Sequence, residues 1–123
     1  MSAGRKHRKA AGRYRQAEAL RAADKAAALV VGTKGPDDII IKGTVMYVVP
    51  RVLPGMADEL AEAIGRRRRA TLDGQCDCGG RRHMGSAGRT RRAMGTFLHE
   101  EDCSAHDRAI AALVLRTGWR WSA

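Results

Sequence analysis

The 123-residue chain has few large aromatic side chains: it contains one Phe, two Tyr and two Trp. Alanine supplies much of its remaining apolar content, and an alanine side chain buries little area when a core forms. Burial of one large apolar side chain contributes only roughly 1.5–3 kcal/mol, so a core built this way is weak. We therefore expect one compact domain that needs a further source of stability, such as a bound metal ion.

Two further absences bear on where the protein works. No apolar run reaches the ~18 residues that a membrane-spanning helix needs, and the first 16 residues lack the apolar stretch of a signal peptide. The cysteine count is three, an odd number that cannot pair completely into disulfides. These features predict a protein of the reducing cytoplasm without a membrane partner.

Acidic residues are absent from the start of the chain, where the first is Glu18, and the formal net charge is +10 with a pI near 10.6. This balance favours an anionic partner, with DNA or RNA first. Basic residues gather in the N-terminal segment, in one unbroken arginine run and in the glycine-rich segment after the second cysteine. The candidate phosphate contacts are Arg5, Lys6, Arg8, Lys9, Arg13, Arg15, Arg66, Arg67, Arg68, Arg69, Arg81, Arg82, Arg89, Arg91 and Arg92.

The N-terminal half predicts a helix followed by a strand or hairpin. Residues 1–9 are expected to form a basic, disordered arm. Apolar residues then recur at every third or fourth position, which predicts a helix over 10–31. The β-branched runs at 39–41 and 45–49 predict strand, and the intervening Lys42-Gly43 predicts either a hairpin turn or a bulge within one long strand.

Two further helices are expected. One covers 56–69, with acidic residues near its start and four arginines near its end, and a turn at 71–74 follows it. The arginines are explained either by ordinary helix electrostatics or by a cationic tip that binds phosphate. The other helix covers 105–116, with Ser104 as its N-cap, Asp107 as the capping-box partner and Gly118 just after its end.

All three cysteines lie in two short clusters, Cys76-Asp77-Cys78-Gly79-Gly80 and the segment from His99 to His106 that contains Cys103. Three thiolates and one imidazole complete a tetrahedral Zn²⁺ site, and the glycines allow backbone amides to approach the sulfurs of the C-x-C turn. His99 and His106 both remain candidates for the fourth ligand. Such a site would contribute an apparent ~10–16 kcal/mol, enough to decide whether a small domain folds.

The order of these parts resembles a treble-clef zinc finger over about residues 76–116: a cysteine turn, a hairpin with Ala93–Leu98 as its return strand, and a ligand at a helix start. That resemblance implies His106 as the fourth ligand. The C-x-C…H-x3-C spacing is also similar to small uncharacterised zinc proteins of actinobacteria and their phages, which implies His99 and a phage-encoded protein. Neither resemblance implies an activity.

The chain lacks the motifs of a catalytic zinc site. His99-Glu100-Glu101 contains an H-x-E segment, but the P-C-x-x-C that follows it in zinc deaminases is absent, as is H-E-x-x-H. Four protein ligands also leave no open position for a substrate. We therefore expect a protein that is not an enzyme.

The expected fold is α+β: an N-terminal helix, a short hairpin or strand, a middle helix and a C-terminal treble-clef-like zinc unit. The arm at 1–9, a helix-strand-helix region over 10–70 and the zinc unit over 71–123 are expected to form one compact domain. The expected function is regulatory nucleic-acid binding through phosphate contacts. The alternatives are docking on a larger machine such as the ribosome or RNA polymerase, and a structural role in a virion or ribonucleoprotein.

Overall fold

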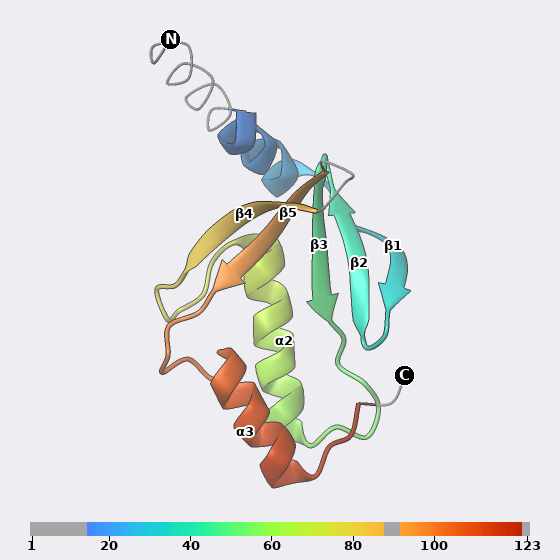
Figure 1. Cartoon of the computed structure of the whole chain (residues 1–123), viewed down its shortest axis with the longest axis vertical. Coiled ribbons are helices and arrows are strands. Elements are labelled where there is room, and N and C mark those ends of the chain that lie inside the picture. The colour runs from blue at the N-terminus through green and yellow to red at the C-terminus, as the bar shows by residue number, and fades with distance from the viewer. Residues whose placement is uncertain (1–14, 88–91, 122–123) are drawn as a thin grey trace.

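The computed structural model describes residues 15–87 and 92–121 and has an α+β architecture, as expected (Figure 1). Residues 15–25 are helical, and two further helices accompany one mixed five-stranded sheet. The elements are β1 (Leu29–Lys34), β2 (Asp37–Lys42), β3 (Val45–Pro50), α2 (Asp58–Asp73), β4 (Arg81–Ala87), β5 (Arg92–Leu98) and α3 (Asp107–Thr117). The strand order is β1-β2-β3-β5-β4. No helix among these residues is long and apolar enough to cross a membrane.

The prediction of one helix over 10–31 is wrong at its C-terminal end. Helical structure stops at Lys25, and β1 begins four residues later. Val30, Val31 and Thr33 are β-branched residues that suit a strand, and β1 pairs with β2 in antiparallel register. A two-residue turn at Gly35-Pro36, with Gly35 in the left-handed conformation at φ 58°, joins the two strands. The expected arm at 1–9, like residues 10–14 of the expected helix, lies outside the described residues.

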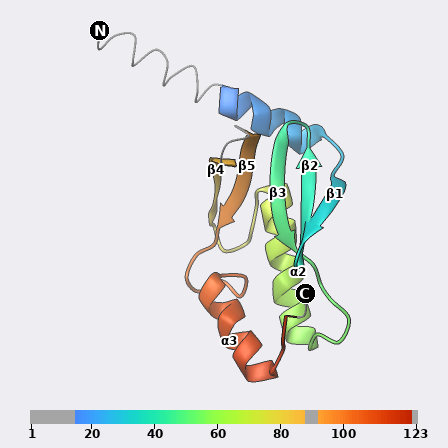
Figure 2. The same ribbon diagram turned by 45° about the vertical axis from the view of Figure 1, so that its right-hand side comes forward.

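The β-branched runs form a hairpin rather than one bulged strand. β2 and β3 pair from Asp37↔Pro50 to Lys42↔Val45, and Gly43 turns the chain with φ 60°. Alternate residues of both strands are buried beneath the sheet, where α2 lies (Figures 1 and 2). These residues form a cluster that we call the sheet core: Ala23, Ile40, Val45, Tyr47 and Val49.

The β4–β5 hairpin of the expected zinc unit completes the same sheet. β5 lies beside β3 in parallel, through the pairs Val45↔Ala93 and Met46↔Met94 only. Below these pairs the two strands diverge, and α2 packs across the opening (Figure 1). The sheet therefore contains strands from both regions expected from the sequence, 10–70 and 71–123.

The middle helix begins two residues later than expected and ends one turn later, because Thr71–Asp73 belong to α2 rather than to a turn. Gly74 ends it in the left-handed conformation, and the four arginines lie mid-helix, since its last turn contains no basic residue. Cations from the sheet neutralise that end instead. Lys42 Nζ donates to the Leu72 carbonyl at 3.0 Å, and Arg82 Nη2 donates to the Asp73 carbonyl at 2.7 Å.

α3 begins at Asp107, and its N-cap is His106 rather than the expected Ser104. The imidazole Nδ1 of His106 accepts a hydrogen bond from the Arg108 amide at 3.1 Å, so it takes the role that the capping box was expected to play. Gly118 ends α3 at φ 70°, as expected. The inner faces of α2 and α3 meet in a second apolar cluster: Leu60, Ala63, Ile64, Ile110 and Leu113.

Candidate metal centre

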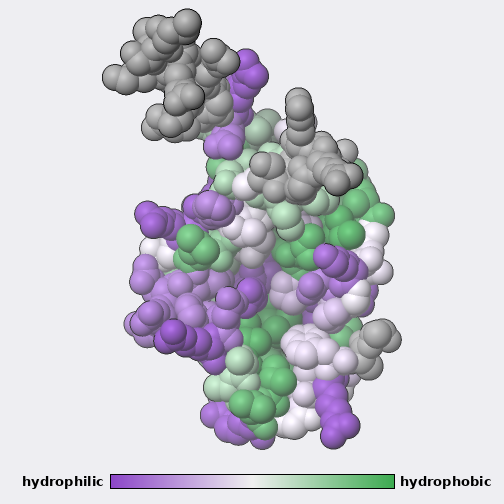
Figure 3. Space-filling model, viewed as in Figure 1, coloured by the Kyte–Doolittle hydropathy of each residue, from purple (hydrophilic) through white to green (hydrophobic). Residues whose placement is uncertain are grey.

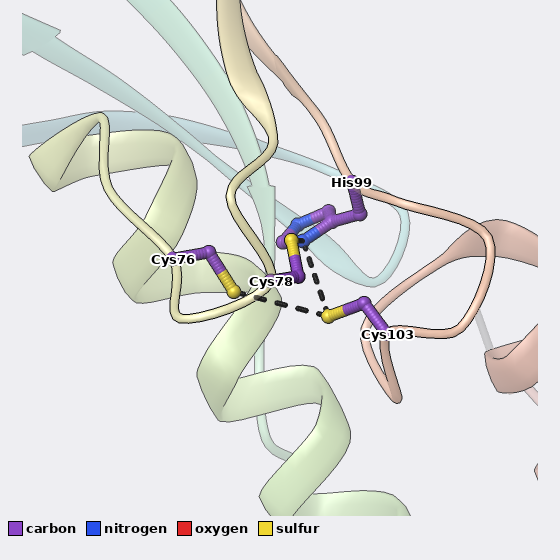
Figure 4. A group of neighbouring side chains, drawn as sticks. All are labelled: Cys76, Cys78, His99 and Cys103. Atoms are coloured by element: carbon purple, nitrogen blue, oxygen red, sulfur yellow. Dashed lines mark hydrogen bonds between the residues drawn. The ribbon is translucent and has the colours of Figure 1, made fainter.

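Two segments that are distant in sequence bring Cys76, Cys78, His99 and Cys103 together (Figure 4). The first two follow α2, His99 follows β5, and Cys103 lies in the loop before α3. One ligand atom from each residue lies within 4.8 Å of all the others. The three cysteines are free, so the group offers three thiols and one imidazole to a single ion.

The distances within this group match the edges of a tetrahedral site. Bonds of ~2.3 Å to sulfur and ~2.0 Å to nitrogen place two sulfurs ~3.8 Å apart and a sulfur and a nitrogen ~3.5 Å apart. The Sγ atoms of Cys76 and Cys103 are 3.8 Å apart. His99 Nδ1 lies 3.5 Å from Cys103 Sγ and 3.8 Å from Cys78 Sγ. Three of the six donor pairs therefore have the separations of a tetrahedral site, and all six lie within 4.8 Å.

Two glycines shape the loop over 75–80, which we call the first ligand loop. The Gly79 amide donates to the Cys76 carbonyl at 3.0 Å, and Gly79 adopts a left-handed φ of 80°. The Gly80 amide donates to Cys78 Sγ at 3.3 Å. A Cβ on Gly80 would lie 2.2 Å from the Leu98 carbonyl oxygen, so only glycine lets this loop pass so close to the end of β5.

The loop over 99–106, the second ligand loop, is a pair of turns around Cys103. The Cys103 amide donates to the Glu100 carbonyl and the His106 amide to the Cys103 carbonyl, both at 3.0 Å. The Ala105 amide donates to Cys103 Sγ at 3.4 Å. Cys103 lies before α3 rather than on its first turn, so a turn amide, not the helix N-terminus, stabilises this sulfur as an anion.

The surroundings set the protonation states of the donors. Burial raises the pKa of the Cys78 thiol, but hydrogen bonds from the Glu100 and Gly80 amides and from the Cys76 and Cys103 side chains together bring this pKa below its usual value. Burial is also the main reason that the pKa of Cys103 is raised. The pKa of His99 is lowered, first by burial and then by the nearby Arg67, so its ring is neutral at pH 7 and can bind a metal. The His99 ring packs against Phe97 at 4.7 Å between centroids.

Of the two candidate histidines, the structure brings only His99 to the cysteines. His106 Nδ1 is occupied by the Arg108 amide at the start of α3. The glycine-rich first ligand loop and the return strand at Ala93–Leu98, which lies within β5, occur where the sequence predicts them.

The candidate phosphate contacts fall into different groups. Seven lie outside the described residues: Arg5, Lys6, Arg8, Lys9, Arg13, Arg89 and Arg91. Arg92 begins β5, and its side chain is not described. Arg15, Arg66, Arg69 and Arg81 form no ion pair with any described residue.

The remaining three arginines connect elements of the fold. Arg67 pairs with Asp107 at the start of α3. Arg68 donates to Asp38 on β2 at 2.8 Å and to the Pro50 carbonyl at 3.1 Å. Arg82 makes a bidentate pair with Asp24 at 2.6 and 3.1 Å, which ties β4 to the helix over 15–25. Sequence reasoning missed these acidic partners, because Asp24 is 58 residues from Arg82 and no local signal links them.

The charge is unevenly distributed between the described residues and the rest. All 13 acidic residues are described, together with 16 of the 23 basic ones, which leaves a net charge of +3. The seven other basic residues lie in segments 1–14 and 88–91. The described residues that adjoin these segments lie at one end of the molecule, since Ala19 and Ala93 pack on the same sheet core (Figure 1).

No protein-family model, no curated protein and no solved structure matches this chain.

Proposed function

We propose that Cys76, Cys78, His99 and Cys103 hold one structural zinc ion. The observation that carries this proposal is the agreement between the donor distances and a tetrahedral site with sulfur-rich ligands. Four protein ligands leave no position for a substrate, so the ion would cross-link the chain rather than catalyse a reaction. The order of turn, hairpin, second turn and helix is similar to a treble clef, although Cys103 precedes α3 instead of opening it.

Cobalt substitution tests this proposal, because Co²⁺ in a tetrahedral thiolate site gives strong visible and thiolate charge-transfer absorption. We expect one equivalent of Co²⁺ to bind, and one equivalent of Zn²⁺ to displace it. Replacing any one of the four residues, for example Cys76→Ser or His99→Ala, should weaken binding by at least tenfold. His106→Ala is the matched control and should retain both bands. Full binding by His99→Ala together with loss in His106→Ala would contradict the proposed ligand set.

We propose further that the zinc-bound protein binds nucleic acid, mainly through its phosphates. The supporting observation is the distribution of charge along the sequence, since segments 1–14 and 88–91 together hold seven of the 23 basic residues. Basic residues in 1–14 and 88–91 have no acidic residue within either segment, whereas Arg67, Arg68 and Arg82 already neutralise carboxylates. We therefore assign the phosphate contacts to the basic residues of segments 1–14 and 88–91 rather than to all four arginines of the run at 66–69.

Salt dependence of binding to a fluorescein-labelled 20-mer tests this assignment. Contact with about six phosphates predicts that log K falls with log salt at a slope near −5. A variant with Arg5, Lys6, Arg8 and Lys9 changed to Gln should bind more weakly and reduce the slope by about 3–4. The control Arg67→Gln/Arg68→Gln removes cations that are already paired and should leave the slope unchanged. A salt-insensitive complex, or a slope that changes only in the control, would contradict the proposal.

Docking on a ribosome or RNA polymerase, a virion role, a phage origin and the lack of enzymatic activity stay predictions from the sequence. One observation does favour a protein interface of some kind: β1 exposes three consecutive large apolar residues, Leu29, Val30 and Val31.

A further inference from the structure

The two edges of the sheet are built from opposite kinds of residue. β4, at one edge, begins with Arg81, Arg82 and His83, and charged side chains of this kind prevent an edge from pairing with another strand. β1, at the other edge, carries Leu29, Val30 and Val31, which are 63%, 59% and 56% exposed. An unprotected apolar edge strand is a site for strand pairing between chains.

Nothing within the described chain covers this edge. β1 pairs with β2 alone, and every residue of β1 except the half-buried Gly32 is exposed. The helix over 15–25 packs through Ala23 on the sheet core, and α2 packs under β3 and β5 rather than under β1. Figure 3 shows an apolar surface on the side of the molecule where β1 and β2 lie. With respect to residues 15–87 and 92–121, the apolar residues of β1 therefore face solvent.

The charge of β1 indicates what could cover it. The strand contains no acid and a single cation, Lys34, at its end. It therefore offers little to an anionic partner and no carboxylate to a basic one. A second copy of the same strand needs neither a cluster of cations nor a carboxylate on β1, because a two-fold interface joins an apolar patch to itself. In an antiparallel pair centred between Val31 and Gly32, Lys34 would lie opposite Leu29, so no like charges would meet.

We propose that β1 pairs with β1 of a second copy of this chain, so that the two sheets become one. The interface would bury the three apolar side chains and add backbone hydrogen bonds along the free edge. The register of β1 against β2 shifts between Val30 and Gly32, and such a bulge increases local twist. A single short, twisted strand makes a small interface, so we expect weak association with a Kd of about 10–100 µM. This proposal is independent of both the metal and the nucleic acid.

Sedimentation analysis of the nuclease-treated, metal-loaded protein tests the proposal, in 300 mM salt to screen the net charge. We expect the mass to rise from 13.4 kDa toward twice that value between about 1 and 500 µM. Val31→Lys and Val31→Glu should each stay monomeric at every concentration. An equimolar mixture of the two should associate again, since opposite charges then meet near the two-fold axis. Leu115→Lys, which adds the same charge at a residue 85% exposed on α3, should behave as the wild type.

Hydrogen exchange on the unmodified protein gives a second test that needs no variant to fold. Amides of 29–34 should exchange more slowly at high concentration, whereas those of 81–87 in the charged edge strand should not change. A wild type that remains at 13.4 kDa up to 500 µM would overturn the proposal. So would a dimer that persists in Val31→Lys, or concentration-dependent protection in 81–87 alone, because another surface would then be responsible.

Discussion

The sheet core and the two ligand loops differ in what holds them in place. The five residues of the sheet core are at most 2% exposed, and they interlock across β2, β3 and the helix over 15–25. In the ligand loops at 75–80 and 99–106, only Cys103 and Ala105 are buried. The loops therefore have almost no apolar surface to bury, and their arrangement depends on four donor atoms that meet at one point. A chain poor in aromatic residues thus combines a small conventional core with one candidate metal cross-link.

The largest expected effect comes from removing one of the four proposed metal ligands. Cys103→Ser should abolish stoichiometric zinc binding and lower the free energy of unfolding by at least about 5 kcal/mol, because metal binding and loop folding are coupled. Urea unfolding followed by tryptophan fluorescence, with zinc content measured on the same samples, checks this. Ser104→Ala, one residue away and exposed, is the control and should change stability by less than about 0.5 kcal/mol. Equal stability of the Cys103 variant would mean that the loops hold without metal.

The second effect tests the sheet side. Ile40 is among the largest fully buried side chains, so Ile40→Ala should cost about 2–5 kcal/mol of stability. Its effect on metal affinity should be less than twofold in the folded protein, because the sheet core includes no residue of either ligand loop. Zinc competition with a chromophoric chelator below the unfolding temperature measures this. A large loss of metal affinity would show that the two regions are coupled.

The third effect concerns Gly80, where the first ligand loop lies against the end of β5. Gly80→Ala should cost about 1–3 kcal/mol and weaken metal binding, since its Cβ would collide with the Leu98 carbonyl at the end of β5. Gly79→Ala meets no atom within 4 Å and carries only the strain of its left-handed backbone. It should therefore cost less, about 1 kcal/mol. The reverse order of the two variants would contradict the close approach of this loop to β5.

The smallest effect separates the two histidines of the second ligand loop. His106→Ala removes the N-cap of α3 and should cost about 0.5–2 kcal/mol with the metal retained. His99→Ala should lose the metal. Thermal unfolding and metal content of both variants measure the difference, and loss of metal in His106→Ala alone would reverse the assigned roles.

The parts of the fold that follow local chemistry could be predicted from the sequence. The C-x-C-G-G turn, the hairpin turn at Gly43 and the end of α3 at Gly118 each depend on residues within a few positions. β1 could not be predicted in this way. Its Val30-Val31 pair continues the helical period of the alanine-rich segment, and only pairing with β2 selects the strand. Which histidine is the fourth ligand depends on where β5 ends relative to α3. That position cannot be read from the residues around either histidine.

The arginines teach a related lesson. Arg66 to Arg69 form one basic run in the sequence, yet Arg68 pairs with Asp38 and Arg67 with Asp107, and neither pairing is visible from local composition. α2 directs neighbouring side chains toward different elements, so a run of like charges becomes separate ion pairs. A run of arginines in a sequence therefore overestimates the number of cations available to phosphate when the run lies on a helix that packs against acidic residues.

The position of β5 between β3 and the edge strand β4 affects the order in which the chain can fold. β1, β2 and β3 are complete as a local three-stranded meander soon after they are synthesised, but the neighbour of β3 on its other side lies more than 40 residues later. Such distant pairing is slow, because the intervening loop must be closed first. During translation the β3 edge thus stays unpaired at least until Ala93 and Met94, its partners in β5, have been made. The protein is most vulnerable to misassembly in that interval, before the chain can bring Cys103 to Cys76 and Cys78.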